Sequence, residues 1–269
     1  MTSFKNIYDQ SINNPENFWQ DVSNDVFWFK KPTKILDKSN PPFYKWFGNG
    51  VTNTCYNALD VHIDKGKGQK TALIYDSPIT GNKSKFTYEE LKAKVSKFAG
   101  GLKDQGVNKG DRVIIYMPMI PEAVIAMLAC ARIGAIHSVV FGGFASDELA
   151  SRIDDSTAKI LVTASCGFEP GRTVEYKPLV DEALKKAKHK IEKLILFQRK
   201  GHEVKLNSSN ELDWQEVVSK AKDVDCVEMN SNELAYILYT SGTTGTPKGI
   251  VRDIGGHIVA LKWTMKNIY

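Results

Sequence analysis

Residues 112–143 read RVIIYMPMIPEAVIAMLACARIGAIHSVVFGG. The first six residues are a β-branched run, which is typical of a buried strand. Pro121 then marks the first turn of a helix, and Gly134 marks the end of that helix. A second β-branched run follows at residues 135–143. This order of strand, helix and strand predicts a βαβ unit, whose two strands lie in a largely parallel sheet.

The same alternation continues on both sides of this unit. Before it, TALIYD at residues 71–76 predicts a strand, and Thr87 with Glu90 predicts a capping box for a helix over residues 87–106. After it, the patterns predict helices at residues 146–156, 176–190 and 212–222, and strands at 158–165, 193–198 and 233–241. The sequence therefore predicts an α/β fold in which βαβ layers surround a largely parallel sheet.

Residues 1–60 lack this rhythm and are rich in Asn and aromatic side chains, with three of the five tryptophans at Trp19, Trp28 and Trp46. We expect them to form a cap over the larger body. The aromatic rings are interpreted as anchors that pack an irregular segment onto a core, and a ligand platform is the alternative.

Composition excludes several classes of protein. The 269 residues are 42% hydrophobic and 25% charged, which is typical of a globular chain rather than a fibrous or disordered one. A net charge of +5 is small for a dedicated nucleic-acid binder. The apolar stretch at residues 123–144 contains Arg132 and His137, so it predicts a buried helix and strand rather than a membrane span. We expect small anionic partners, and neither nucleic acid nor membrane.

The cysteines and the N-terminus predict a cytoplasmic location. The four cysteines are spread singly, so they indicate neither a zinc site nor a redox dithiol, and they suit a reducing compartment. Asp9 and Glu16, with no arginine before Arg112, argue against a transit peptide, so the start is interpreted as mature.

The segment YTSGTTGTPKG at residues 239–249 has the composition of a polyphosphate-binding loop. Glycines bring backbone N–H groups close to an anion, hydroxyls add donors, and Lys248 adds a positive charge. It is not a Walker A loop, because Pro247 and Gly249 stand where that motif needs glycine and a hydroxyl residue. The β-branched residues that follow predict a strand–loop–strand clasp. A Ser/Thr/Gly surface turn is the alternative.

This segment resembles the phosphate-loop signature of the adenylate-forming superfamily, which includes acyl-CoA synthetases, firefly luciferases and the adenylation domains of peptide synthetases. In that superfamily the loop and its lysine hold the β- and γ-phosphates of ATP. The resemblance assigns phosphate binding to Thr240, Ser241, Gly242, Thr243, Thr244, Gly245 and Lys248. It implies an AMP-binding domain over residues 61–269, incomplete at its C-terminal end, and an acetyl-CoA-synthetase-type N-terminal region over residues 1–60.

Two more segments, at residues 46–63 and 134–144, resemble the short-chain branch of the superfamily, the acetyl- and propionyl-CoA synthetases. Glu169, Pro170, Gly171 and Arg172 stand where acetyl-CoA synthetases carry an Arg-Gly-Gly-Arg type motif that contacts CoA. Only the final arginine is kept, and the EPGR sequence is more similar to propionyl-CoA synthetases. The resemblance implies that this CoA-binding segment contacts a CoA phosphate through Arg172, and a surface salt bridge is the alternative.

The reaction that the resemblance implies has two steps. A carboxylate attacks the α-phosphate of Mg-ATP to give an acyl adenylate and diphosphate, and the CoA thiol then displaces AMP. We therefore expect an acid–thiol ligase for propionate or acetate that uses ATP, CoA and Mg²⁺, with the phosphate loop as a clamp on the leaving group. No catalytic residue is assignable in this chain, and metal ligands and oligomeric state stay open.

The chain ends at Tyr269 inside an expected helix, so we expect an N-terminal portion of a longer enzyme that is inactive alone. A truncated, non-catalytic nucleotide-binding module is the alternative. A Rossmann oxidoreductase is less favoured, because no GxGxxG motif follows any expected strand.

Two other sets of residues invite a chemical role. His137 is a conceivable base, but its strand context favours a buried, hydrogen-bonded imidazole without catalytic function. Asp147, Glu148, Asp154 and Asp155 are conceivable metal ligands, but their spacing fits the two ends of a helix.

Overall fold

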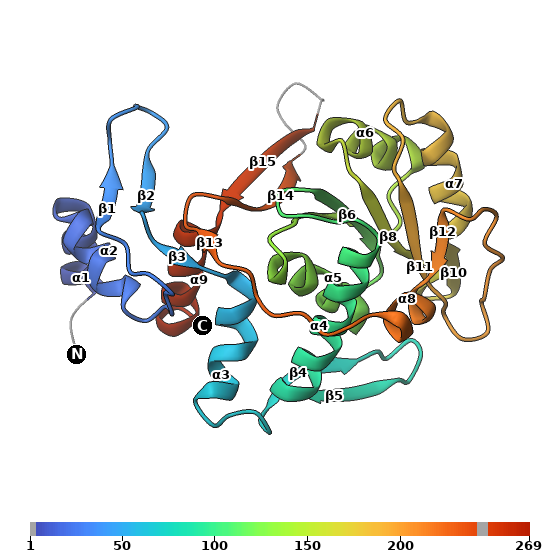
Figure 1. Cartoon of the computed structure of the whole chain (residues 1–269), viewed down its shortest axis with the longest axis horizontal. Coiled ribbons are helices and arrows are strands. Elements are labelled where there is room, and N and C mark those ends of the chain that lie inside the picture. Colours follow the sequence, from blue (N-terminus) through green and yellow to red (C-terminus); the bar gives the residue numbers. More distant parts are fainter. Residues whose placement is uncertain (1–3, 241–246) are drawn as a thin grey trace.

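A seven-stranded sheet forms the centre of the molecule (Figure 1). The computed structural model describes residues 4–240 and 247–269, and the strand order is β12-β11-β8-β6-β7-β14-β15. The strands are β6 (Arg112–Met117), β7 (Ile136–Phe141), β8 (Ile160–Ala164), β11 (Lys193–Phe197), β12 (Glu211–Asp213), β14 (Leu234–Thr240) and β15 (Lys248–Asp253). All neighbours are parallel except β14 and β15, which are antiparallel. The predicted α/β fold with a largely parallel sheet is confirmed.

Helices cover both faces of this sheet. One face carries α4 (Tyr88–Asp104), α5 (Pro121–Arg132) and α8 (Trp214–Lys220), and the other carries α6 (Ser146–Ser156) and α7 (Tyr176–Lys186). In β6, Val113 and Ile115 join the first core, whereas Ile114 and Tyr116 join the second. Because alternate residues of a strand face opposite ways, this apolar run is buried on both sides.

The local signals for helix ends act largely as predicted. Thr87 and Glu90 form the reciprocal capping box of α4, and Pro121 opens α5. The predicted helix at residues 176–190 is too long, because α7 ends at Lys186 and Ala187 is extended. Lys190 then turns back, and its Nζ donates to the carbonyl oxygens of Leu184 and Ala187. A lysine cation thus satisfies the last carbonyls where the helix dipole is negative.

TALIYD forms a strand, as predicted, but not in the main sheet. It is β4 (Thr71–Asp76), which pairs antiparallel with β5 (Lys83–Thr87) in a separate hairpin below α4 (Figure 1). A second small hairpin, β9 (Cys166–Glu169) with β10 (Arg172–Glu175), follows β8. Residues of both hairpins reach the edge of the sheet at which the parallel strands β6 and β7 end.

The N-terminal region is more regular than expected. It comprises α1 (Phe4–Asn13), α2 (Pro15–Ser23), β1 (Lys34–Asp37), β2 (Lys45–Gly48), β3 (Val51–Thr52), the π-helix η1 (Tyr56–Asp60) and α3 (Val61–Asp64). It packs on β13 (Met229–Asn230) and α9 (Ile254–Asn267), so both ends of the described chain lie together (Figure 1). Trp28 and Phe47 are buried anchors there, as predicted, but Phe43 and Tyr44 are 74% and 50% exposed at the β1–β2 turn.

In the described ranges, every helix is too short or too polar to cross a membrane. The apolar stretch at residues 123–144 forms most of α5 and then β7, as predicted.

Candidate functional site

The parallel strands end along one edge of the sheet. β6 ends at Met117, β7 at Phe141, β8 at Ala164 and β14 at Thr240. Because the carboxyl ends of parallel strands share an edge, the segments after them are neighbours in space. Open α/β sheets bind ligands at this edge, where the chain leaves adjacent strands towards opposite faces. Here β6 leads to α5 on one face and β8 leads to α7 on the other. The predicted site segments follow β14 and β8, so they share this edge.

The β14–β15 hairpin flanks the predicted phosphate loop. Thr240 pairs with Lys248 across the hairpin, and Tyr239 pairs with Gly249. The other loop residues of the prediction, Ser241, Gly242, Thr243, Thr244 and Gly245, lie outside the described residues. Lys248 is exposed and has no ion-pair partner in the part of the chain that the structure describes. Strands on both sides of the loop agree with the predicted strand–loop–strand clasp, in which Lys248 begins a strand and not a helix.

Helix α6 holds the loop end of this hairpin through Tyr239. The Tyr239 hydroxyl donates to Oδ2 of Asp155 at 2.6 Å, and the Arg152 guanidinium lies 5.3 Å from the centre of the Tyr239 ring. Burial and this hydrogen bond raise the pKa of Tyr239, so the phenol stays protonated at neutral pH. The end of β14 is therefore tied to a helix on the sheet and not left to the solvent.

The other acidic side chains of α6 also form ion pairs or hydrogen bonds within the fold. Asp147 pairs with Lys186 at 2.9 Å, Glu148 pairs with Arg152 at 2.6 Å, and Asp154 accepts from the backbone N–H of His189 at 2.8 Å. These residues lie at the two ends of α6, as predicted from their spacing.

A cleft of about 320 Å³ opens along the same edge. Its walls come from residues 75–80, 117–120, 139–142 and 167–169, together with Tyr176 and Arg199. Glycine is required at the Tyr176 wall. A Cβ on Gly142 would overlap the Tyr176 hydroxyl and lie 2.9 Å from the carbonyl oxygen of Met117, and a Cβ on Gly167 would lie 2.7 Å from that hydroxyl. The conformation of the glycine segments therefore depends on one buried tyrosine, whose pKa burial raises to about 12.

Two hydrogen bonds with the Tyr116 hydroxyl fix the turn after β7. The Tyr116 hydroxyl donates to the carbonyl oxygen of Phe144 at 2.8 Å and accepts from the backbone N–H of Gly143 at 3.3 Å. Gly143 has a φ of +101°, which favours glycine. The segment FGGF, which the sequence analysis linked to the short-chain branch, thus forms a fixed turn beside the cleft.

Sequence analysis missed Arg199. It is nearly buried at 9% exposure, follows β11, and lines the cleft. Its guanidinium lies 4.7 Å from the centre of the Phe168 ring, and its backbone N–H donates to Ser165 Oγ at 2.9 Å. Within the described ranges no carboxylate pairs with it, so its charge is available to an anion in the cleft. Its position just past a predicted parallel strand was the signal that could have found it.

The predicted CoA segment forms the tip of the β9–β10 hairpin. Arg172 pairs with Glu169, with Nη2 to Oε2 at 2.6 Å, and Arg172 is exposed. Pro170 and Gly171 make the turn between them, where Gly171 has a φ of +75°. Glu169 also lines the cleft. The hairpin therefore places the segment at the cleft mouth, with the surface salt bridge that was the alternative prediction for Arg172.

The prediction for His137 is wrong in one respect. The side chain is half-buried in β7 and stacks on Tyr236, with ring centroids 5.6 Å apart. Its Nδ1 is buried and has no hydrogen-bond partner among the described residues, although we expected a satisfied imidazole. The neighbour that packs on the imidazole is the face of the Tyr236 ring, which offers its nitrogen no hydrogen-bonding atom. Burial and the nearby His257 charge lower the pKa of His137 to about 4, so it is neutral at pH 7.

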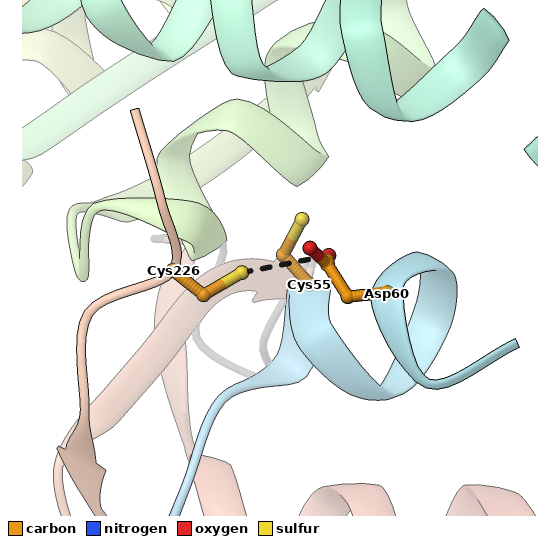
Figure 2. A group of neighbouring side chains, drawn as sticks. All are labelled: Cys55, Asp60 and Cys226. Carbon is orange, nitrogen blue, oxygen red and sulfur yellow. Dashed lines mark hydrogen bonds between the residues drawn. The ribbon is translucent and has the colours of Figure 1, made fainter. Parts of the chain in front are cut away.

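One group in the described ranges has the composition of a metal site. Cys55, Asp60 and Cys226 bring their ligand atoms within 4.8 Å of one another (Figure 2). However, the buried guanidinium of Arg132 contacts all three, at 3.5 Å from Cys55 Sγ, 2.8 Å from Asp60 Oδ2 and 3.1 Å from Cys226 Sγ. An arginine cation therefore already supplies the positive charge that these ligands would give to a metal.

Comparisons with known proteins agree with this architecture. Residues 60–268 match the family described as AMP-binding enzyme, and residues 4–58 match the one described as acetyl-coenzyme A synthetase N-terminus. In structure, the chain is similar to acetoacetyl-CoA synthetase from Streptomyces lividans, with a TM-score of 0.87 and 25% sequence identity over 98% of this chain and 40% of that one.

Two of the relatives show how similar known proteins are to this chain in sequence. The rat protein named acyl-CoA synthetase short-chain family member 3, mitochondrial, is 53% identical over 99% of this chain and 39% of its own length. An acetyl-coenzyme A synthetase of Streptomyces avermitilis is 43% identical over 97% of this chain and 40% of its own length. The chain thus spans about two fifths of the length of these relatives.

Proposed function

The chain belongs to the family of AMP-binding enzymes, and from this premise we propose that its protein is an ATP-dependent, AMP-forming acyl-CoA synthetase for short-chain carboxylates. One observation carries the proposal most directly. The β14–β15 hairpin places Thr240 opposite Lys248 at the ends of a Ser/Thr/Gly loop, on the carboxyl edge of a parallel sheet. Hydroxyl and backbone donors beside an unpaired cation are what a polyphosphate requires.

This arrangement suits the first step of the proposed reaction. A carboxylate and a polyphosphate repel each other, so the site must position both and stabilise the charge that grows on the diphosphate leaving group. Lys248 would hold that leaving group, and Thr240 would add a hydroxyl donor. Mg²⁺, when bound, neutralises phosphate charge in such sites. Tyr239, tied to Asp155, keeps the hairpin in place while the loop engages its ligand.

For the second step, we propose that CoA enters along the cleft. CoA has anionic phosphates and an extended pantetheine arm. For the phosphates, the cleft offers Arg199 and the hairpin tip formed by Glu169, Pro170, Gly171 and Arg172. For the pantetheine arm, it offers an apolar wall at Val140 and Ile120. In this proposal Arg172 exchanges Glu169 for a phosphate oxygen. An exposed ion pair contributes about 0–1 kcal/mol, so the exchange costs little.

We propose propionate as the carboxylate, with acetate as the alternative. Support comes from the EPGR sequence at residues 169–172, which is more similar to propionyl-CoA synthetases. Diphosphate exchange on the protein that carries this chain tests it, with acetate, propionate and butyrate compared at equal concentration. A clear preference for acetate would overturn the propionate assignment.

The second candidate is a non-catalytic nucleotide-binding module, which the hairpin that places Thr240 opposite Lys248 would also suit. We propose that the 269 residues alone do not form acyl-AMP. Titration of this chain with a fluorescent ATP analogue, with NADH as a competitor control, tests nucleotide binding. Diphosphate release on adding propionate and ATP then tests catalysis separately, and release would contradict the proposed inactivity.

We propose a cytoplasmic location as well. All four cysteines are free in the structure, which suits a reducing compartment. The mammalian relatives carry the word mitochondrial in their names, which is said of those proteins. Fractionation of the native cells separates the two locations, and recovery in a mitochondrial fraction would contradict the proposal.

A further inference from the structure

Cys55 and Cys226 meet in the interior although they are far apart in the sequence. Cys55 has no exposed surface and precedes η1, whereas Cys226 is half-buried in the segment between α8 and β13. Their sulfur atoms lie within 4.8 Å of each other (Figure 2). Arg132 Nη1 contacts both sulfurs, at 3.5 Å and 3.1 Å. Two thiols held by one guanidinium are thus close enough to react with each other after a small rotation of their side chains.

The charges around the pair favour one thiolate. Arg132 on α5 and Lys92 on α4 are the two cations, and both bind Asp60, at 2.8 Å and 3.0 Å. Asp60 supplies one negative charge, so the cluster carries an excess positive charge unless a thiol ionises. Asp60 Oδ2 lies 3.7 Å from the Cys226 sulfur, and this negative charge disfavours a thiolate on Cys226, so Cys226 keeps its proton. Cys55 is left as the group that neutralises the excess charge.

The pKa values of the two thiols are shifted in opposite directions. Burial acts to raise the pKa of Cys55, but the hydrogen bond from Cys226 and the Arg132 cation outweigh it and lower that pKa. The hydrogen bond to Cys55, followed by burial, raises the pKa of Cys226. The chain also contains two matched controls. Cys130 and Cys166 are buried too, and burial raises the pKa of both thiols.

We propose that Cys55 and Cys226 are a redox-sensitive thiol pair that hydrogen peroxide converts into a disulfide. The Cys55 thiolate attacks one peroxide oxygen, so that an S–O bond forms, the O–O bond breaks, and hydroxide leaves to become water. Cys226 then attacks the sulfenic sulfur, an S–S bond forms, and the S–O bond breaks with loss of a second water. Two thiols lose two electrons, and one peroxide gains them.

Peptide mapping of the intact chain tests the pair directly. After a limiting dose of peroxide, non-reducing digestion and mass spectrometry should find one cross-linked peptide that contains Cys55 and Cys226. Cys130 and Cys166 should still take up an alkylating reagent after unfolding. Oxidation of those two cysteines at a similar rate, or no cross-link, would overturn the proposal. The same dose applied in urea is the control, and there the selectivity should disappear.

Two variants assign the roles. Cys226→Ser should leave a sulfenic acid on Cys55 that dimedone traps, whereas Cys55→Ser should slow oxidation of Cys226 at least tenfold. Cys130→Ser is the control and should leave the cross-link unchanged. If dimedone labels Cys226 but not Cys55, the assigned nucleophile is wrong.

The pH dependence of the rate separates a thiolate from an ordinary buried thiol. An ordinary thiol with a pKa near 8.5 gains about fiftyfold in thiolate between pH 6.5 and pH 8.5. With the pKa of Cys55 lowered beside Arg132, the cross-linking rate should rise much less than fiftyfold over this range. A fiftyfold rise would contradict the thiolate. Zinc retained by the purified chain after gel filtration, and lost in Cys55→Ser, would overturn the redox role in favour of a metal site.

Discussion

Lys248 is the residue on which the proposed nucleotide site depends most. It lies at the start of β15 without a carboxylate partner among the described residues, so its charge is not used within the fold. We expect Lys248→Met to weaken binding of an ATP analogue by about 10–100-fold, because a charge-assisted hydrogen bond contributes about 1.5–3 kcal/mol.

Lys45 provides the matched control for this change. It is also an exposed lysine at the start of a strand, in the distant β1–β2 hairpin. Lys45→Met should leave the dissociation constant unchanged. Equal effects of the two substitutions in a fluorescence titration would contradict a phosphate contact at Lys248.

His137 gives a second prediction at the residue scale, through its low pKa of about 4. In the unfolded chain a histidine titrates near 6.5, so below that pH the unfolded state binds a proton that the folded state does not. Stability is therefore present above pH 6.5 and is lost as the pH falls towards 4. Between about pH 7.5 and pH 4.5 the loss from this residue should be about 2 kcal/mol.

Urea unfolding at these two pH values measures this effect. His137→Gln should reduce the difference in unfolding free energy between the two pH values, whatever its effect at neutral pH. An unchanged acid sensitivity in the His137 variant would show that the imidazole titrates normally.

At the scale of elements, the turn after β7 shows how the sheet edge is shaped. A methyl group on Gly142 meets the Tyr176 hydroxyl and the carbonyl oxygen of Met117, both of which are buried. We expect Gly142→Ala to lower the free energy of unfolding by about 1–3 kcal/mol, since overpacking forces neighbours to shift. Chemical denaturation of the variant and the parent chain measures this difference in unfolding free energy.

Two further variants locate the cause of this loss. Gly48→Ala is the control, because its Cβ would meet nothing nearer than 3.7 Å. It should change stability by less than about 0.5 kcal/mol. Adding Tyr176→Phe to Gly142→Ala removes the overlapping hydroxyl and should recover part of the loss. No recovery would place the strain elsewhere in the turn.

At the scale of the whole molecule, the N-terminal region and α9 share one core. Phe47 is 2% exposed and packs with Ile254, Ile258 and Val259 of α9. We therefore expect Phe47→Ala to cost about 3–5 kcal/mol in unfolding free energy. Phe43→Ala, at a side chain that is 74% exposed, should cost less than about 0.5 kcal/mol. Far-ultraviolet circular dichroism during heating gives the unfolding midpoint of each variant. Equal midpoints for Phe47→Ala and Phe43→Ala would contradict a shared core.

The sequence was sufficient for features that depend on neighbouring residues. Helix α5 begins at Pro121, α4 has its capping box at Thr87, and the run at residues 112–117 is a doubly buried strand. These features are predictable because capping, backbone restriction and side-chain alternation act over a few residues.

Contacts between segments that are distant in the sequence could not be predicted from local patterns. TALIYD has the pattern of a strand, but that pattern does not specify its partner, and β4 joins a separate hairpin. Arg199, Tyr176 and Gly142 meet in one cleft only because three connections return to the same sheet edge.

The cysteines show this division most clearly. As single cysteines along the sequence, they predicted neither a zinc site nor a redox dithiol. In the fold, the sulfurs of Cys55 and Cys226 both contact Arg132 Nη1. Asp60 Oδ2 lies 3.7 Å from the Cys226 sulfur, although 166 positions separate the two residues in the sequence. Local sequence determined most of the strands and helices. Tertiary packing alone decided which charges and thiols face each other, because electrostatic and hydrogen-bonding partners act over a few ångströms of space, whatever their separation along the chain.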